Sequence, residues 1–179
     1  MSSESHPAVE RVREALQRAG HTPQIRWLSE SARTATAAAE ALDVAVGQIA
    51  SSLVFTRPAS EGATTSAWPV LVITSGRHRV DTALVAALVG VPELGRADAD
   101  FVRLWSGFAI GGVAPVGWLA DIERTGHAAA PPALTVIVDE ALGEHEQVWA
   151  AAGHPHTVFA TSMAALATMT GGLTARVGD

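Results

Sequence analysis

Residues 107–117 read GFAIGGVAPVG, and this run holds the residue types best suited to chemistry by the backbone. It places four glycines and Pro115 within eleven residues. Glycine costs conformational entropy and proline removes a hydrogen-bond donor, so the cluster suits a loop whose shape lets a ligand approach main-chain amides. The local pattern by itself favours a plainer interpretation, a tight connection between two strands.

Two residue types are absent, and their absence excludes several classes of enzyme. All 12 basic residues are arginine. Without lysine the chain cannot form a Walker-type phosphate loop, a pyridoxal Schiff base or the ATP site of a protein kinase. Without cysteine it has no thiol nucleophile, no thiolate metal ligand and no disulfide.

The remaining candidate nucleophiles and ligands form no standard constellation. The sequence has no Gly-x-Ser-x-Gly elbow, since Ser75 lacks the first glycine. The seven histidines lack the helical His-x-x-x-His spacing of zinc sites, so we expect neither a metal nor another cofactor. His154 is predicted to be a turn residue that reaches a pocket. Asp81 and Asp139 are predicted to cap a helix and to fix a turn, respectively, rather than to act as acids or bases.

Charge and size restrict the class of protein. The formal net charge of −6 argues against a protein that grips nucleic acid unaided, because such binding depends largely on basic side chains. We expect RNA contacts that are local or shared with a partner, and no DNA partner. The 179 residues, 48% of them hydrophobic, suffice for one domain with its own core. The sequence shows no secretory leader and no apolar run of membrane-spanning length, so a soluble cytoplasmic protein is expected.

Helical and strand patterns follow one another along the chain without a break in composition. Helices are expected over residues 7–16, 34–42, 82–89 and 98–105 and after Ser162, with Ser31, Asp81 and Ser162 as caps. Strands are expected over residues 24–28, 52–56, 70–74, 134–138, 148–149 and 157–159. Residues 58–68 and 126–132 read as surface loops, and residues 140–146 as a solvated acidic segment. Because helices and strands do not strictly alternate, we predict a single α+β domain with a mixed, partly closed β-sheet or barrel and surrounding helices.

The order of these motifs resembles the YbaK/prolyl-tRNA synthetase-associated domain family. The blocks that carry the likeness are SARTA at residues 31–35, GQIASSLVF at 47–55, VLV at 70–72, GRHRVD at 76–81, RA at 96–97 leading through FV at 101–102 to the run at 107–117, IVD at 137–139 and AGHP at 152–155. Their joint spacing is more specific than any single block. The resemblance covers residues 8–177 and leaves residues 1–7 as an N-terminal tail.

The resemblance implies a deacylase that hydrolyses the ester of a mischarged small amino acid on transfer RNA, with tRNA-Pro-type substrates favoured. The implied partner is the aminoacyl-tRNA 3′ end, with an aminoacyl-tRNA synthetase as a second candidate, and the protein would be a monomer or a homodimer. Backbone N–H groups of the loop would stabilise the carbonyl oxygen as it gains negative charge. The catalytic residues implied are Ser51, Gly111 and Gly112. The substrate-binding residues implied are Arg33, Thr34, Ser52, Phe55, Ile110, Val113, Pro115, Gly153 and His154, and Trp118 is considered for stacking on a base.

One departure from the family pattern bears on activity. The family carries a lysine at the position of Ser51, and a serine hydroxyl brings no positive charge to a phosphate or a developing anion. Losing a charge-assisted contact costs about 1.5–3 kcal/mol unless another group replaces it, and the candidates for that role are Arg33, Arg77 and Arg79. The alternative function is therefore a catalytically degenerate binding or regulatory module. Both functions, the deacylase and the degenerate module, require the segment that begins at Ser51 and the loop at residues 107–117 to line one cavity.

Overall fold

The computed structural model describes residues 6–63, 66–118 and 134–179. The α-helices in this part of the chain are α1 (Pro7–Arg18), α2 (Ala35–Leu42), α3 (Thr82–Val89), α4 (Ala99–Ser106) and α6 (Met163–Thr170). The strands are β1 (Ile25–Trp27), β2 (Ile49–Pro58), β3 (Ala67–Ser75), β4 (Gly95–Arg96), β5 (Thr135–Asp139), β6 (Val148–Ala151), β7 (Thr157–Thr161) and β8 (Leu173–Ala175). Two short 3-10 turns, η1 (Val46–Gln48) and η2 (Glu140–Glu144), precede β2 and follow β5. Of the expected tail, residues 1–5 lie outside the described ranges, as does the loop expected over residues 126–132.

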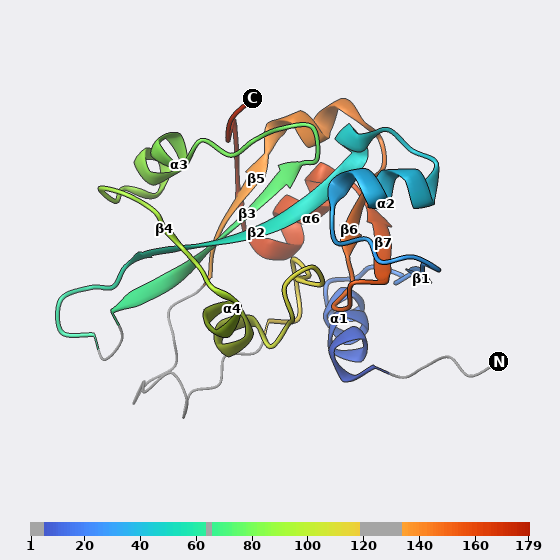
Figure 1. The fold of residues 1–179 in the computed structure, drawn as a ribbon, viewed down its shortest axis with the longest axis horizontal. Helices are drawn as coiled ribbons and strands as arrows, with labels where there is room; N and C mark the ends of the chain where they lie inside the picture. The colour runs from blue at the N-terminus through green and yellow to red at the C-terminus, as the bar shows by residue number, and fades with distance from the viewer. Residues whose placement is uncertain (1–5, 64–65, 119–133) are drawn as a thin grey trace.

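The strands form one mixed sheet in the order β1-β7-β6-β2-β3-β5-β8, with β4 added beside β2 (Figure 1). The pairs β1·β7, β7·β6, β2·β3 and β2·β4 are antiparallel, whereas β6·β2, β3·β5 and β5·β8 are parallel. The predicted α+β class and mixed sheet are confirmed, and the sheet remains open rather than closing into a barrel.

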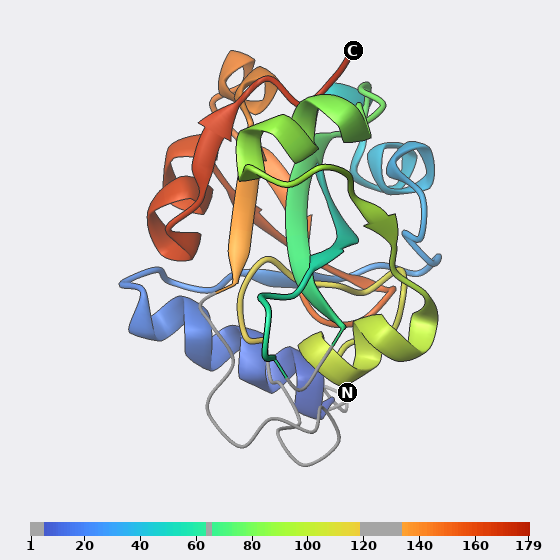
Figure 2. The same cartoon turned by 90° about the vertical axis from the view of Figure 1, so that its left-hand side faces the viewer.

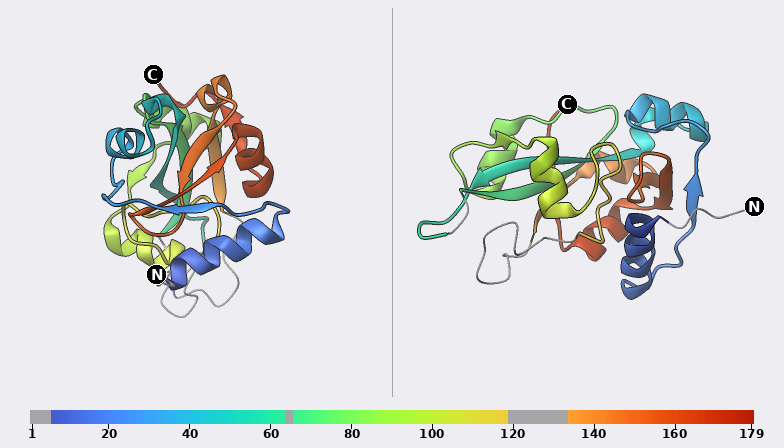
Figure 3. Two further views of the ribbon diagram at one scale, coloured as in Figure 1. Left: turned by 90° about the vertical axis from the view of Figure 1, so that its right-hand side faces the viewer. Right: turned by 60° about the horizontal axis from the view of Figure 1, so that its bottom comes forward.

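Helices cover both faces of this sheet because its central strands are apolar on both sides. In β3, Val70 to Ile73 are fully buried, with Leu71 and Ile73 facing one core and Val70 and Val72 another. Helices α1, α4 and α6 pack on the first face, and α3 packs on the second. A third apolar cluster joins α2 to the β6–β7 side of the sheet. Figure 2 shows α6 and α2 on opposite sides of the strands, and Figure 3 shows α4 and the loop after it in front of the long β2–β3 pair.

On the side of β2 that faces away from β3, the partner strands β6 and β4 are both shorter than β2, and this leaves a gap in the sheet. Strand β6 pairs with β2 only at Ile49 and Ala50, and β4 pairs with it only at Phe55 and Thr56. Between these contacts, no strand of the described chain borders residues 51–54 on the side away from β3. The gap therefore exposes a stretch of backbone edge inside the molecule.

Most helix boundaries follow the predicted caps, and the exceptions have local causes. Asp81 and Ser162 cap α3 and α6 as expected. The expected cap Ser31 is wrong, because the Thr34 hydroxyl accepts the N–H of Ala37 and α2 starts at Ala35. Trp68, expected in a polar loop, extends β3 and is buried against Trp105 at a ring distance of 5.6 Å.

Two further differences concern short segments. Strands β4 and β8 are too short to give a period-two pattern and were not expected. The segment expected to be solvated over residues 140–146 is only partly so, because η2 buries Ala141 and Leu142.

Candidate functional site

The gap along β2 opens into a cavity of about 430 Å³. Its walls come from β2, from the start of α2, from the loop after α4 and from strands β6 and β7. The lining residues are Ala32, Arg33, Thr34, Ala35, Ala38, Ile49, Ala50, Ser51, Ser52, Leu53, Val54, Phe55, Arg96, Ala97, Val102, Ile110, Gly111, Val113, Trp149, Ala151, Thr157 and Val158. The expectation that the Ser51 segment and the loop at 107–117 share one cavity is confirmed.

The structure brings most, but not all, of the predicted site residues to this cavity. Those that line it are Arg33, Thr34, Ser51, Ser52, Phe55, Ile110, Gly111 and Val113. Gly112, Pro115, Gly153 and His154 are not among the lining residues. Pro115 is buried and borders a separate hollow beside α1. The roles of all these residues remain predictions, and the structure supplies their positions.

Gly111 and Gly112 occupy different environments. Gly111 has φ +89°, a left-handed conformation that favours glycine, and the Cγ of Arg33 lies 3.0 Å from where its Cβ would be. A Cβ on Gly112 would lie 2.8–3.0 Å from backbone atoms of His154, so the loop touches the 153–155 turn directly. The Gly112 N–H donates to the carbonyl of Ala109 at 3.0 Å. By contrast, the N–H groups of Gly111 and Val113 have no hydrogen-bond partner among the described residues.

Ser52 is a polar residue whose backbone faces the gap in the sheet. The N–H of Gly76 donates to the carbonyl of Ile49 at 2.8 Å, and bonded pairs alternate along an antiparallel ladder. Ser52, paired with Ile73, therefore directs its N–H and C=O away from β3 and towards the gap. Its Oγ is buried and makes no hydrogen bond within the described chain. Ser52 thus directs its main-chain hydrogen-bonding groups towards the cavity, and its buried hydroxyl lies in the cavity wall without a partner in the described chain.

Two charged side chains line the cavity in the described structure, and both are arginines. Arg33 and Arg96 are exposed at its edge, and neither forms an ion pair with a described residue. Of the other proposed replacements for the family lysine, neither lines the cavity. Arg77 is paired with Glu144 at 2.6 Å, and Arg79 lies beside the last residue, Asp179, to whose carbonyl its backbone N–H donates. Arg96 was not predicted as a site residue, because only its pairing beside Phe55 in β4 brings it there.

His154 belongs to a cluster of rings beside the loop. Its ring lies 4.9 Å from that of His6, 5.2 Å from that of Trp27 and 5.5 Å from that of His156. His154 Nδ1 accepts the N–H of His156 at 3.1 Å. Trp118, considered for base stacking, is away from the cavity, where its indole N–H donates to the carbonyl of Ala114 at 2.8 Å.

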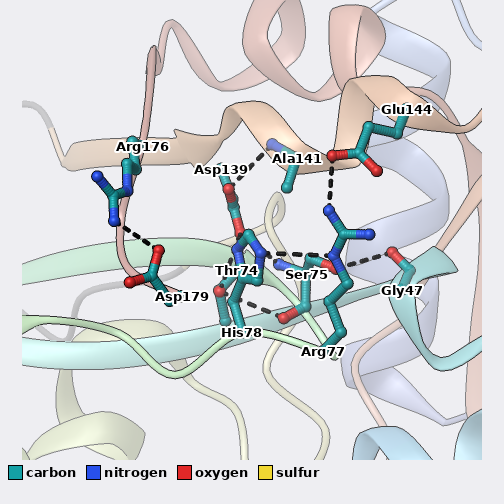
Figure 4. A network of polar contacts seen from close by, with 10 residues as sticks. All are labelled: Gly47, Thr74, Ser75, Arg77, His78, Asp139, Ala141, Glu144, Arg176 and Asp179. Atoms are coloured by element: carbon teal, nitrogen blue, oxygen red, sulfur yellow. Dashed lines mark hydrogen bonds and ion pairs between the residues drawn. The ribbon is translucent and has the colours of Figure 1, made fainter.

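A second polar cluster is centred on Asp139 and lies outside the cavity (Figure 4). The carboxylate, fully buried at the end of β5, accepts the N–H groups of Ser75 at 2.9 Å and Ala141 at 3.0 Å. It also contacts Thr74 Oγ1 at 3.3 Å and His78 Nδ1 at 2.9 Å. The prediction that Asp139 fixes the turn after its strand is confirmed.

Two absences hold for the part of the chain that the structure describes. No group of three histidine or acidic side chains gathers closely enough to hold a metal ion. No helix in residues 6–63, 66–118 and 134–179 combines the length and apolar character needed to cross a membrane.

Comparison with known families identifies the kind of domain that contains this cavity. The family model for the aminoacyl-tRNA editing domain matches residues 29–169. The chain belongs to this editing-domain family. The resemblance drawn from the sequence motifs is confirmed, and the cavity lies within the matched region. A comparison with curated proteins gave no match.

Solved structures share the same fold over nearly the whole chain. The editing domain is 35% identical, with a TM-score of 0.78, to a protein described as a candidate trans-editing enzyme for prolyl-tRNA synthetase; 98% of this chain and 99% of that one are covered. It is 34% identical, with a TM-score of 0.79 and the same coverage, to a structure from work on computational grafting of epitopes onto scaffold proteins. A hypothetical protein at 24% identity shares the fold with a TM-score of 0.76, with 94% of this chain and 99% of that one covered.

Proposed function

We propose that this editing domain is a trans-editing deacylase that hydrolyses the ester between a mischarged small amino acid and the 3′ end of a transfer RNA, with tRNA-Pro-type substrates favoured. The observation that carries the proposal is the cavity in which the glycine loop meets the open edge of β2. The similarity to a protein described as a candidate trans-editing enzyme supports the same class of substrate.

The walls of the cavity suit a small side chain. Ala35, Ala38 and Ala151 line it, and short side chains leave room for the terminal ribose as well as the amino acid. A volume of about 430 Å³ lies within the range of small-molecule sites. A bulky amino acid would compete with the ribose for this space, so selection would be steric.

The reaction adds water to the ester carbonyl carbon and breaks its bond to the ribose oxygen, which takes a proton as the free amino acid leaves. Negative charge develops on the carbonyl oxygen, and fixed N–H groups stabilise it without reorganising. The unpartnered amides of Gly111 and Val113, together with the Ser52 amide that faces the gap, are the candidate donors. The net charge of −6 would repel the phosphates of the incoming RNA strand. Arg33 and Arg96 would attract these phosphates locally at the cavity.

A deacylation assay on a panel of mischarged transfer RNAs tests this function. We expect turnover with at least one small amino acid, such as alanine or serine on tRNA-Pro, and little with a large one. The control is the correctly charged transfer RNA with the same protein. Absence of turnover with every small amino acid would contradict the proposal.

Ser52→Ala is expected to lower kcat/KM for deacylation by about 10- to 100-fold. The Ser52 hydroxyl has no partner in the described chain, and under this proposal it donates a hydrogen bond to the charged transition state, a contact worth about 1.5–3 kcal/mol. The measurement is single-turnover deacylation. Ser60→Ala is the matched control, since that serine is exposed in the β2–β3 connection. Equal rates for the two variants would remove Ser52 from the site.

Ser51 favours a second candidate function, a binding or regulatory module that keeps the cavity without catalysis. We expect Ser51→Lys to raise kcat/KM by no more than about tenfold, because Arg33 and Arg96 already bring positive charge to the cavity. Ser51→Gln, of similar length without charge, is the control. A rise from no detectable turnover to efficient deacylation in Ser51→Lys would instead support the degenerate module.

A further inference from the structure

The loop at residues 107–117 is held from behind by one side chain of α1. Arg11 donates from Nε to the carbonyl of Gly117 and from Nη2 to the carbonyl of Gly107, each at 3.3 Å. A single planar guanidinium therefore bonds both ends of the loop whose middle lines the cavity. Figure 1 shows α1 beside this loop.

The guanidinium is held in a partly apolar setting. Its Cζ lies 5.1 Å from the ring centre of Phe108, a residue only 1% exposed. Burial lowers the pKa of Arg11 below the ordinary value, and the side chain still carries its charge at neutral pH. Two carbonyls and an aromatic face thus replace part of the water that Arg11 has lost.

The backbone of α1 also approaches the loop and the turn beside it. A Cβ on Gly117 would lie 3.2 Å from the carbonyl oxygen of Arg11, and one on Gly153 would lie 2.8 Å from that of Ala8. Helix α1 therefore contacts the far end of the loop and also the turn that touches Gly112. Its neighbour Arg13 differs, since it pairs with Glu10 on the same helix and does not reach the loop.

We propose that Arg11 is a positioning residue for deacylation, which fixes the two ends of the 107–117 loop so that its middle keeps the geometry facing the cavity. This inference rests on the proposed function for its effect on rate. The site would then depend on a helix that lies before the region matched by the family model, residues 29–169.

The test compares Arg11→Met, which keeps the aliphatic stem but removes the donors, with Arg11→Lys, which can reach one carbonyl but not span two. Arg13→Met is the matched control on the same helix. For each variant of the 179-residue chain, kcat and KM for deacylation, the thermal midpoint and the hydrogen exchange of peptides covering residues 107–117 are measured.

We expect Arg11→Met to lower kcat by about 10- to 100-fold, since small displacements of a catalytic loop have effects of this size. Exchange should rise selectively in residues 107–117, with Arg11→Lys intermediate in both readouts and Arg13→Met unchanged. Unaltered loop exchange in Arg11→Met, or a rise spread over the whole protein, would overturn the inference. If the wild type does not deacylate any substrate, the proposed function fails, whereas the exchange comparison still supports or overturns the positioning of the loop by Arg11.

Discussion

Gly112→Ala is expected to lower kcat/KM for deacylation by at least about 100-fold, although Gly112 itself does not line the cavity. Its new Cβ would fall 2.8–3.0 Å from the backbone of His154, and backbone atoms cannot rotate away as a side chain can. The loop must therefore move off the 153–155 turn and carry its neighbours Gly111 and Val113 out of place in the cavity wall. Misplacement by about 1 Å is enough for a loss of this size.

Two alanine substitutions separate this effect from the general cost of replacing glycine. Gly62→Ala places a side chain at φ +83° with no atom within 4 Å, so it adds only the strain of a left-handed residue. Gly111→Ala adds similar strain at φ +89°, and the atom nearest to its Cβ is Cγ of Arg33, which can rotate away. We expect the rate to be unchanged in Gly62→Ala and reduced less in Gly111→Ala than in Gly112→Ala. Wild-type deacylation by a folded Gly112→Ala protein would show that the contact with His154 does not shape the site.

Asp139→Asn is expected to destabilise the fold by about 3 kcal/mol, which is a large share of the stability of an ordinary domain. The carboxylate accepts bonds from Ser75, Thr74 and Ala141 and contacts His78, while an amide turns one of its two atoms into a donor. At least one buried donor then faces another donor without an acceptor. The midpoint of urea unfolding, with the slope checked for two-state behaviour, measures the loss.

The exposed ion pair near this cluster provides the control. Glu144→Gln removes the partner of Arg77, whose side chain is 41% exposed, and such surface pairs contribute less than about 1 kcal/mol. We expect its unfolding midpoint to stay near that of the wild type. A small loss for Asp139→Asn, comparable to that of Glu144→Gln, would mean that the buried carboxylate does not hold β3, β5 and the His78 turn together.

Elements whose signals are local were predictable from the sequence. Asp81 precedes a helix and Gly90 follows it, and both act within one turn of their own position, so α3 has the predicted bounds. The apolar run at residues 70–74 is typical of a strand buried on both faces, and β3 includes it. Trp68 was misplaced because the Trp105 ring against which it packs is distant in sequence.

The candidate site likewise has a part that could be predicted from the sequence and a part that could not. The glycine loop and the segment entering at Ser51 were recognisable because their residue types and order match a family pattern. The places of Arg96 and Arg11 at the site were not predicted, because both depend on contacts between distant segments. Arg96 reaches the cavity through pairing of β4 with β2, and Arg11 reaches the loop across about a hundred residues of chain. The unpartnered Ser52 hydroxyl could not be predicted, because it lies at the gap that β6 and β4 leave along β2.

The sequence by itself determined the fold class, most element bounds, the family and the two segments that meet at the cavity, because periodicity, capping and motif order act over a few neighbouring residues. Only the tertiary structure decided which amides are free, which arginines supply charge and what holds the loop. These properties depend on contacts between segments far apart in the chain, such as Gly112 with His154, where the packing of one backbone against another sets the geometry.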